Sequence, residues 1–167
     1  MNLQFYVEKL KHSEKYKDFI KKNPEAYPCS GFFIIDLEGK DNKSHFDFYV
    51  PKDKKMFSFQ LERNCEKVPI EMLEEKVPGK VDLDIDFDFK DIENLILEKM
   101  QAEGIRNKIQ KILLSLQKKE SVHYLIGTVF ISGLGMLKVN IDLKEMKITE
   151  FEKKSFFDIM KIKRKKK

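Results

Sequence analysis

The sequence predicts an α+β fold in which helices pack on an antiparallel β-sheet. Its 167 residues contain short segments that alternate apolar and polar residues between turn residues, as half-buried strands do. They also contain two longer segments in which apolar residues recur every three or four positions, as on amphipathic helices. The segments follow the order helix and three strands, acidic strand, helix and three strands. We expect one compact domain, with a tandem α-β-β-β repeat as an open alternative.

The N-terminal part, residues 1–62, is expected to form a helix followed by three strands. The helix covers residues 3–22 and ends at Asn23-Pro24, because a residue before proline avoids the helical conformation. Turn-rich segments separate the strand candidates, which are residues 31–37, 44–50 and 56–62. Residues 63–80 then form a polar connection with room for one helical turn.

An acidic segment, residues 81–89, alternates apolar and acidic residues without a break. As a β-strand it would bury its apolar side chains on one face. The other face would present carboxylates at a spacing of about 7 Å, those of Asp82, Asp84, Asp86 and Asp88. Carboxylates on a straight strand diverge and no glycine bends this segment, so the spacing disfavours a calcium loop. A solvated sheet face is the main expectation, and binding of a basic partner or a divalent metal is the alternative.

The C-terminal part, residues 81–160, is expected to add a long helix and three more strands. Residues 91–116 show the strongest helical periodicity, and Gly104 is placed to bend or divide the helix. The strand candidates are residues 122–131, 134–143 and 146–151, and a short helix is expected at 154–161. Residues 132–135, Ser-Gly-Leu-Gly, lack the Gly-Lys-Ser/Thr of a phosphate-binding loop and are interpreted as a hairpin turn.

A short internal match raises the question of a repeat. Residues 51–59 align without gaps with residues 143–151, and both segments would contain the turn between a second and a third strand. An internal repeat and a chance similarity between two lysine-rich turns are both open.

The helix from Asp91, the strand pair from Val122 and residues 139–148 resemble the PepSY family of small α+β modules. Residues 139–142, Val-Asn-Ile-Asp, are similar to the hydrophobic-x-hydrophobic-Asp ending before the tight turn of these modules. The Thr-Gly-Lys turn usual in the family is missing, since residues 145–147 are Glu-Met-Lys. A cystatin-like helix on a sheet fits the same pattern. The resemblance implies a non-catalytic module that binds or inhibits, often associated with secreted proteases, and it transfers no functional residue.

Charge is distributed unevenly along the chain. The net charge is +5, from 33 Lys and Arg against 28 Asp and Glu, but the tail 161–167 alone holds six of the basic residues. The body is therefore close to neutral, and its scarcity of arginine disfavours sequence-specific reading of nucleic acid. A solvated tail is the plainest expectation. The tail residues are also candidates for contact with an anionic membrane or with nucleic acid: Lys161, Lys163, Arg164, Lys165, Lys166 and Lys167.

The other candidates for chemistry are scattered. His12, His45 and His123 lie in separate segments without the spacing of metal ligands, and Cys29 and Cys65 belong to no motif. His45 and Asp47 fall on one face of their strand candidate, two residues apart, with no nucleophile beside them. We therefore expect no cofactor and no catalytic residue. Two isolated cysteines, no N-terminal signal pattern and no apolar run long enough to cross a bilayer predict a cytoplasmic protein.

These patterns favour a non-enzymatic binding protein that uses a sheet face or a groove for an unknown protein or peptide partner. The first alternative is a peripheral protein whose basic tail contacts anionic membrane or nucleic acid. The second is a metal-dependent or Cys/His hydrolase whose residues meet only in the fold.

Overall fold

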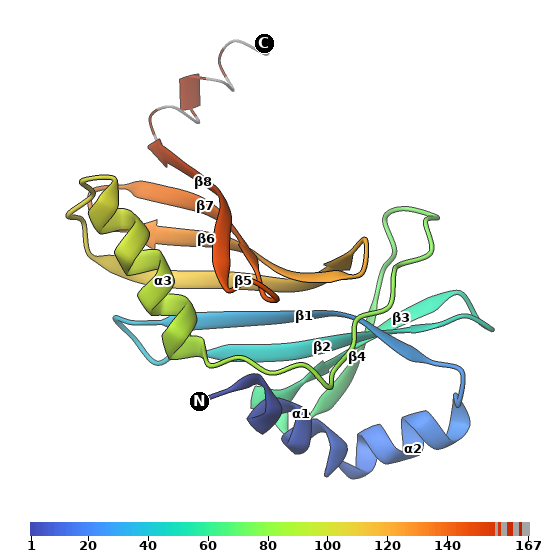
Figure 1. Cartoon of the computed structure of the whole chain (residues 1–167). Helices are drawn as coiled ribbons and strands as arrows, with labels where there is room; N and C mark the ends of the chain where they lie inside the picture. Colours follow the sequence, from blue (N-terminus) through green and yellow to red (C-terminus); the bar gives the residue numbers. More distant parts are fainter. Residues whose placement is uncertain (156, 158–159, 162–163, 165–167) are drawn as a thin grey trace.

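The computed structural model describes residues 1–155, 157, 160–161 and 164, in which helices cover one face of a single antiparallel sheet (Figure 1). This confirms the predicted α+β class. The N-terminal half contains α1 (Leu3–Lys11), α2 (Glu14–Lys22), β1 (Tyr27–Asp36), β2 (Lys43–Val50), β3 (Lys55–Gln60), a 3-10 turn (Leu61–Arg63) and β4 (Glu66–Ile70). The C-terminal half contains α3 (Phe89–Ala102), β5 (Ile109–Lys119), β6 (Val122–Ile131), β7 (Gly135–Asp142) and β8 (Lys147–Ser155).

The strands lie in the order β4-β3-β2-β1-β5-β6-β7-β8, so each half is a four-stranded meander. The two meanders meet at β1 and β5, which are antiparallel and in register, with Gly31 opposite Leu116 and Phe33 opposite Leu114. Each half therefore contributes four strands, where the sequence predicted three in each half and a separate acidic strand. The additional strands are β4 and β5, which lie in segments that were predicted to be a connection and part of a helix.

The prediction of one helix over residues 91–116 is wrong in its C-terminal part. α3 ends at Ala102, and Gly104 follows with a φ of 71°, a left-handed conformation that suits glycine and stops the helix. β5 then buries every second residue of 112–116 on the core side. A register shift between Ile109 and Lys111, together with Leu113 on the opposite face, leaves apolar residues at 109, 112, 113 and 116, which is the spacing of a helix face.

The predicted helix over residues 3–22 is two helices. α1 ends before His12, and Ser13 begins α2 by accepting a hydrogen bond on its hydroxyl from the backbone N–H of Tyr16 (3.4 Å). Serine is a favoured residue at a helix N-terminus because its oxygen accepts from a backbone donor that has no partner within the helix. The break lets α1 and α2 follow different parts of the sheet (Figure 1).

The acidic segment is not a β-strand, and this prediction was wrong. The segment crosses the helix-covered side of the molecule (Figure 1), where its backbone makes isolated hydrogen bonds and one isolated β-bridge, between Asp88 and Asn2. Phe87 O accepts a hydrogen bond from Leu3 N (2.9 Å), and Val81 N donates to Pro28 O (2.8 Å). Burial still alternates, because Val81, Phe87 and Phe89 are buried. The pattern thus predicted which side chains point inward but not how the backbone is paired.

Residues 51–59 and 143–151, which match in sequence, contain turns at different positions within the two meanders. The first segment contains the turn between β2 and β3, and the second contains the turn between β7 and β8. In two related meanders, the β2–β3 turn would correspond to the β6–β7 turn, so the short match does not follow the topology. The predicted hairpin turn is confirmed, because residues 132–134 join β6 to β7 and Gly133 has a φ of 78°.

Phenylalanine dominates the core between the helices and the sheet. Phe19 of α2 packs edge to face on Phe59 of β3, with ring centroids 5.2 Å apart, a geometry that adds about 0.5–1.5 kcal/mol to the burial itself. Phe89 of α3 lies 5.0 Å from Phe33 of β1 in the same way. Tyr6 of α1 also contacts Phe33, with ring centroids 6.0 Å apart, so α1, α2 and α3 pack on one side of the sheet. The opposite side has no helix on it within the described part of the chain (Figure 1).

Gly127→Ala is expected to lower the free energy of unfolding by about 1–3 kcal/mol. Gly127 lies in the middle of β6, and an added methyl group would lie 2.8 Å from Val139 Cγ2 and 3.1 Å from Leu114 Cδ2. Both neighbours are buried in the core. Urea unfolding followed by circular dichroism measures the change.

Gly79→Ala is the matched control, because nothing lies within 4 Å of a methyl group added there. Its free energy of unfolding should stay within about 0.5 kcal/mol of the parent value. Equal stability of the two variants would contradict the packing described for β6.

Candidate functional site

The side of the sheet without helices, which we call the open face, carries apolar side chains that are only partly covered. Strand alternation and the pairing registers place its residues opposite the core. Ile126 of β6 is 42% exposed, and its neighbours are half-buried. On β1, β2, β5, β6 and β7 the open face includes Phe32, Ile34, His45, Asp47, Leu113, Tyr124, Ile126, Thr128, Phe130 and Met136.

Two hollows lie on the open face. One has a volume of about 350 Å³ and lies over β5, β6 and β7, where Tyr124 and Ile126 line it. The other has a volume of about 340 Å³ and lies between Tyr49 of β2 and the loop that follows β4, which contributes Met72 and Val77. Both are open to solvent at the surface and neither is an enclosed catalytic cavity.

Between the hollows lies a polar node, which we define as Ser30, His45, Asp47 and Ser58. Ser30 of β1 and Ser58 of β3 are the register partners of Asp47 on its two sides. The Ser30 hydroxyl donates to Asp47 Oδ2 at 2.7 Å. Asp47 Oδ1 and Ser58 Oγ are buried and have no hydrogen-bond partner among the described residues. Buried polar atoms usually have a partner, so these two oxygens mark the node as unusual.

The node does not have the arrangement of a catalytic triad. His45 Nε2 lies 3.8 Å from Asp47 Oδ1, whereas Ser30 donates directly to the other oxygen of the same carboxylate. A serine nucleophile needs histidine as its proton acceptor, and here the carboxylate occupies that place. Cys29 is also close, since its Sγ donates to Asp47 O at 3.4 Å. Burial, and then the charge of Asp47, raise the pKa of the Cys29 thiol to about 12, so it is not an activated nucleophile.

The sequence pattern indicated two of the four residues of the polar node. It placed His45 and Asp47 on one face of a strand, which the structure also shows, with His45 stacked on Phe32 at 5.1 Å. It missed Ser30 and Ser58, which come from other strands. Only the strand order and register bring them to Asp47, and no local pattern in the sequence contains that information.

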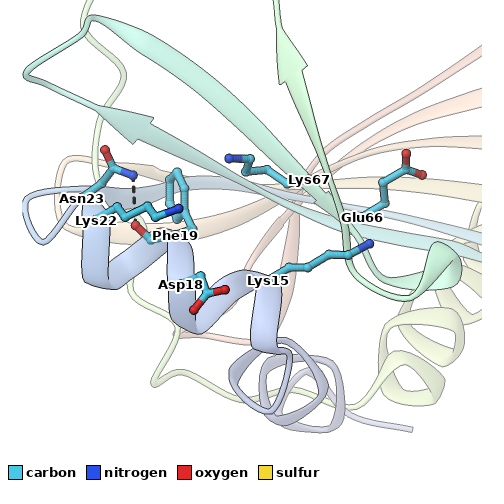
Figure 2. A pocket seen from close by; sticks show the side chains of 7 residues that line it. All are labelled: Lys15, Asp18, Phe19, Lys22, Asn23, Glu66 and Lys67. Carbon is cyan, nitrogen blue, oxygen red and sulfur yellow. Dashed lines mark hydrogen bonds between the residues drawn. The ribbon is translucent and has the colours of Figure 1, made fainter.

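A charged groove lies between α2 and β4 at one edge of the sheet, with a volume of about 330 Å³. Figure 2 shows the basic side chains that line it, and in this view Lys15 extends toward Glu66. Lys67 Nζ lies 5.0 Å from the ring centre of Phe57 and 5.7 Å from that of Phe19, a cation–π arrangement. The groove mixes three lysines with two carboxylates and contains no unpartnered buried polar atom among the described residues. It therefore favours no particular ligand.

The four aspartates of the acidic segment have four different surroundings. Asp82 binds Lys118 Nζ at 2.8 Å, and this hydrogen bond, with the charge of Lys118, lowers the pKa of the carboxyl. Asp86 accepts from the backbone N–H of Gln4 (3.2 Å) at the start of α1. Asp88 caps α3, and Asp84 is exposed. In the described part of the chain no three acidic, histidine or cysteine side chains are grouped to hold a metal.

The remaining histidines and cysteine lie apart from the polar node. His123 accepts a hydrogen bond on Nε2 from Asp82 N (3.1 Å), which joins the acidic segment to the β5–β6 hairpin. His12 and Cys65 both line a third hollow, of about 590 Å³, beside α1. Cys65 is buried there with Sγ directed to Lys9 O (3.8 Å), and His12 Nδ1 contacts Glu8 O (2.7 Å). Among the described residues, no hydrogen bond or ion pair joins His12 to Cys65.

The basic tail is described only in part. Lys161 and Arg164 are exposed, whereas Lys163 and residues 165–167 lie outside the described residues. The predicted short helix at 154–161 starts later than expected, because β8 continues to Ser155, and its described residues 157, 160 and 161 are helical. Phe157 and Met160 are 60% and 52% exposed.

Comparison with known proteins yields a likeness of fold alone. No protein-family model and no curated protein matches the chain. Among solved structures, the chain is similar to one from Clostridium difficile 630 described as a putative lipoprotein, with a TM-score of 0.56. The similarity covers 86% of this chain and 92% of the other, at 13% sequence identity. Within the described residues, no helix is both long and apolar enough to span a bilayer.

His123→Gln is expected to flatten the dependence of stability on pH. Burial lowers the pKa of native His123 below the value of about 6.5 of an unfolded histidine. As pH falls, the unfolded chain therefore takes up the proton first. The stabilisation from neutral His123 is complete above about pH 6.5 and is lost as pH falls through the lower native pKa. Urea unfolding at a series of pH values measures the slope.

Glutamine can accept the hydrogen bond from Asp82 N with its side-chain oxygen but does not titrate. His12→Gln is the control, because His12 is exposed and makes no contact with the acidic segment. His12→Gln should keep the slope of the parent protein. An unchanged slope in His123→Gln would contradict a lowered pKa for the buried His123.

Proposed function

We propose that this protein is a non-enzymatic binding module that docks a protein partner on its open face. The observation that supports this most directly is the polar node, which places two unpartnered buried oxygens among partly exposed apolar side chains. Protein interfaces combine an apolar centre with a few polar groups that find partners only in the complex. The hollows on both sides of the node give a partner surface relief to fit.

The chemistry of the site favours binding over catalysis. Ser30 is hydrogen-bonded to a carboxylate, and the raised pKa of Cys29 keeps its thiol protonated. The kinship with PepSY-like or cystatin-like modules stays a prediction, although it agrees with a binding role. We also propose the cytoplasm as the compartment, which the two free thiols support.

A photo-crosslinking amino acid at Ile126 is expected to give a covalent adduct with a partner in cells that make the protein. Leu97 is the matched control, since it is 41% exposed on α3 while Ile126 is 42% exposed on the open face. Electrophoresis and mass spectrometry detect the adducts. An adduct from position 126 and none from position 97 would show that the partner occupies the open face.

A second substitution tests whether the adduct reports docking. Thr128 lies two residues from Ile126 on the same face of β6, so Thr128→Arg should remove the adduct by steric and charge conflict. Equal adducts from both crosslinking positions, or an adduct that persists with Thr128→Arg, would contradict docking on the open face.

The second candidate function is contact of the C-terminal tail with an anionic surface. Two observations favour it: the apolar residues Phe157 and Met160 are exposed, and the basic tail follows them directly. Amphipathic segments beside clustered lysines bind anionic lipid through both properties.

Deletion of residues 161–167 is expected to weaken binding to vesicles that contain anionic lipid by at least about 100-fold. Each basic residue near such a surface contributes about 1 kcal/mol. Sedimentation with vesicles at low and high salt measures the effect, and vesicles of neutral lipid provide the control. Binding that does not change on deletion would exclude this role of the tail.

A further inference from the structure

We infer that the polar node receives a lysine ammonium group from the protein that docks on the open face. This inference rests on the proposed function and specifies the chemistry of its central contact. The observations that lead to it are the two unpartnered oxygens, the occupied second oxygen of Asp47, and the position of His45.

The node combines the negative charge of Asp47 with two polar atoms that have no partner among the described residues, a carboxylate oxygen that only accepts and a Ser58 hydroxyl that can accept or donate. Asp47 Oδ1 and Ser58 Oγ belong to directly opposed residues on β2 and β3, so one small donor can reach both. Ser58 is 4% exposed, and the side chain of Asp47 is 14% exposed. No Lys or Arg forms an ion pair with Asp47 among the described residues. A carboxylate largely removed from water and lacking a fixed cation attracts a cation from a partner.

The geometry selects an ammonium group over a guanidinium group. Arginine binds carboxylates through two parallel hydrogen bonds, one to each oxygen. Asp47 Oδ2 already accepts from the Ser30 hydroxyl at 2.7 Å, so Oδ1 is the oxygen without a partner and the two-point contact of a guanidinium would compete with Ser30. An ammonium group is a compact charge with three donors, and it can bind Oδ1 and Ser58 Oγ together. A lysine side chain therefore fits the acceptors that remain.

His45 is placed to report the arrival of this cation. Its Nε2 lies 3.8 Å from Oδ1, and its ring stacks on Phe32 with an interplanar angle of 25°. Because the imidazole is this close to Oδ1, a cation that binds Oδ1 changes the electrostatic surroundings of the ring. The two other histidines, His12 and His123, lie outside the node and serve as internal references.

The node and the hollow around Ile126 fit within one interface. Asp47 lies on β2 and Ile126 on β6, three strands apart in the sheet, which is about 14 Å at the usual spacing of strands. An ordinary interface covers about 800 Å² on each partner, which is wide enough to include both positions. A partner that covers Ile126 can thus insert a lysine at Asp47 in the same complex.

The test is a titration of the full-length protein with n-butylammonium chloride, followed through the imidazole proton signals in NMR spectra. The His45 signals should shift and saturate, while those of His12 and His123 stay in place. n-Butanol at the same concentrations should produce no shift. Butylguanidinium should bind more weakly than butylammonium. A shift with n-butanol, or stronger binding of butylguanidinium, would overturn the assignment to a lysine ammonium group.

Asp47→Asn keeps the shape of the side chain and should weaken butylammonium binding by at least about 30-fold, the usual result of removing one charge from a desolvated pair. Ser58→Ala should weaken it less. Asp84→Asn is the matched control, since Asp84 is exposed and lies outside the node, and it should bind as the parent does. Unchanged binding in Asp47→Asn would overturn the inference.

The same variants separate this inference from the proposed function. Asp47→Asn should also reduce the crosslinked adduct at Ile126, whereas Asp84→Asn should not. Crosslinking at Ile126 that does not depend on Asp47 would overturn the lysine contact and leave docking on the open face intact. Saturable binding of butylammonium at His45 without any adduct at Ile126 would overturn docking there and leave the cation site intact.

Discussion

The antiparallel pairing of β1 with β5 is the contact on which the rest of the structure depends. Each half of the chain forms its own meander, but only this pair joins them into one sheet. It also aligns the two cores, because Phe33 and Leu114 are opposed on the side that the helices cover. The same register fixes the other side of the sheet, where Ser30 of β1 comes to lie between Asp47 and the strands of the second half. The open face is therefore a product of both halves.

The acidic segment contacts both halves of the chain on the helix-covered side of the sheet. Its backbone contacts Leu3 at the start of α1 and Pro28 at the start of β1, and Asp82 binds the β5–β6 hairpin through Lys118 and His123. The connection that leads into it passes near Tyr27, whose hydroxyl donates to Pro78 O at 2.7 Å. This route covers one end of the open face and leaves the centre uncovered. The position of the candidate site thus follows from how the chain passes between its two halves.

The sequence predicted the class of the fold and most strand positions, because alternation within a strand is a local pattern. β6 matches its predicted range of 122–131 fully. Prediction from the sequence failed where tertiary pairing overrides the local pattern. β5 was predicted to be helical because its apolar residues at 109, 112, 113 and 116 have helical spacing, and β4 is short and polar. The candidate site was predictable only as far as His45 and Asp47, which share a strand. Ser30 and Ser58 reach them through pairing across strands, and pairing depends on contacts between residues distant in sequence.

The acidic segment and the polar node differ in whether their acidic side chains have partners within the fold. In the acidic segment, Asp82 and Asp86 each accept from a donor in another part of the fold. Asp88 caps α3 and lies 3.8 Å from the N-terminal ammonium group, so the charge of all three is accounted for by structure. At the polar node, an unpartnered buried oxygen on Asp47 and another on Ser58 cost about 1–3 kcal/mol each. An apolar pair at these strand positions would avoid this cost, so stability alone does not explain their presence. Because these two residues lower the stability of the fold locally, a role in binding explains their presence better than a structural role does.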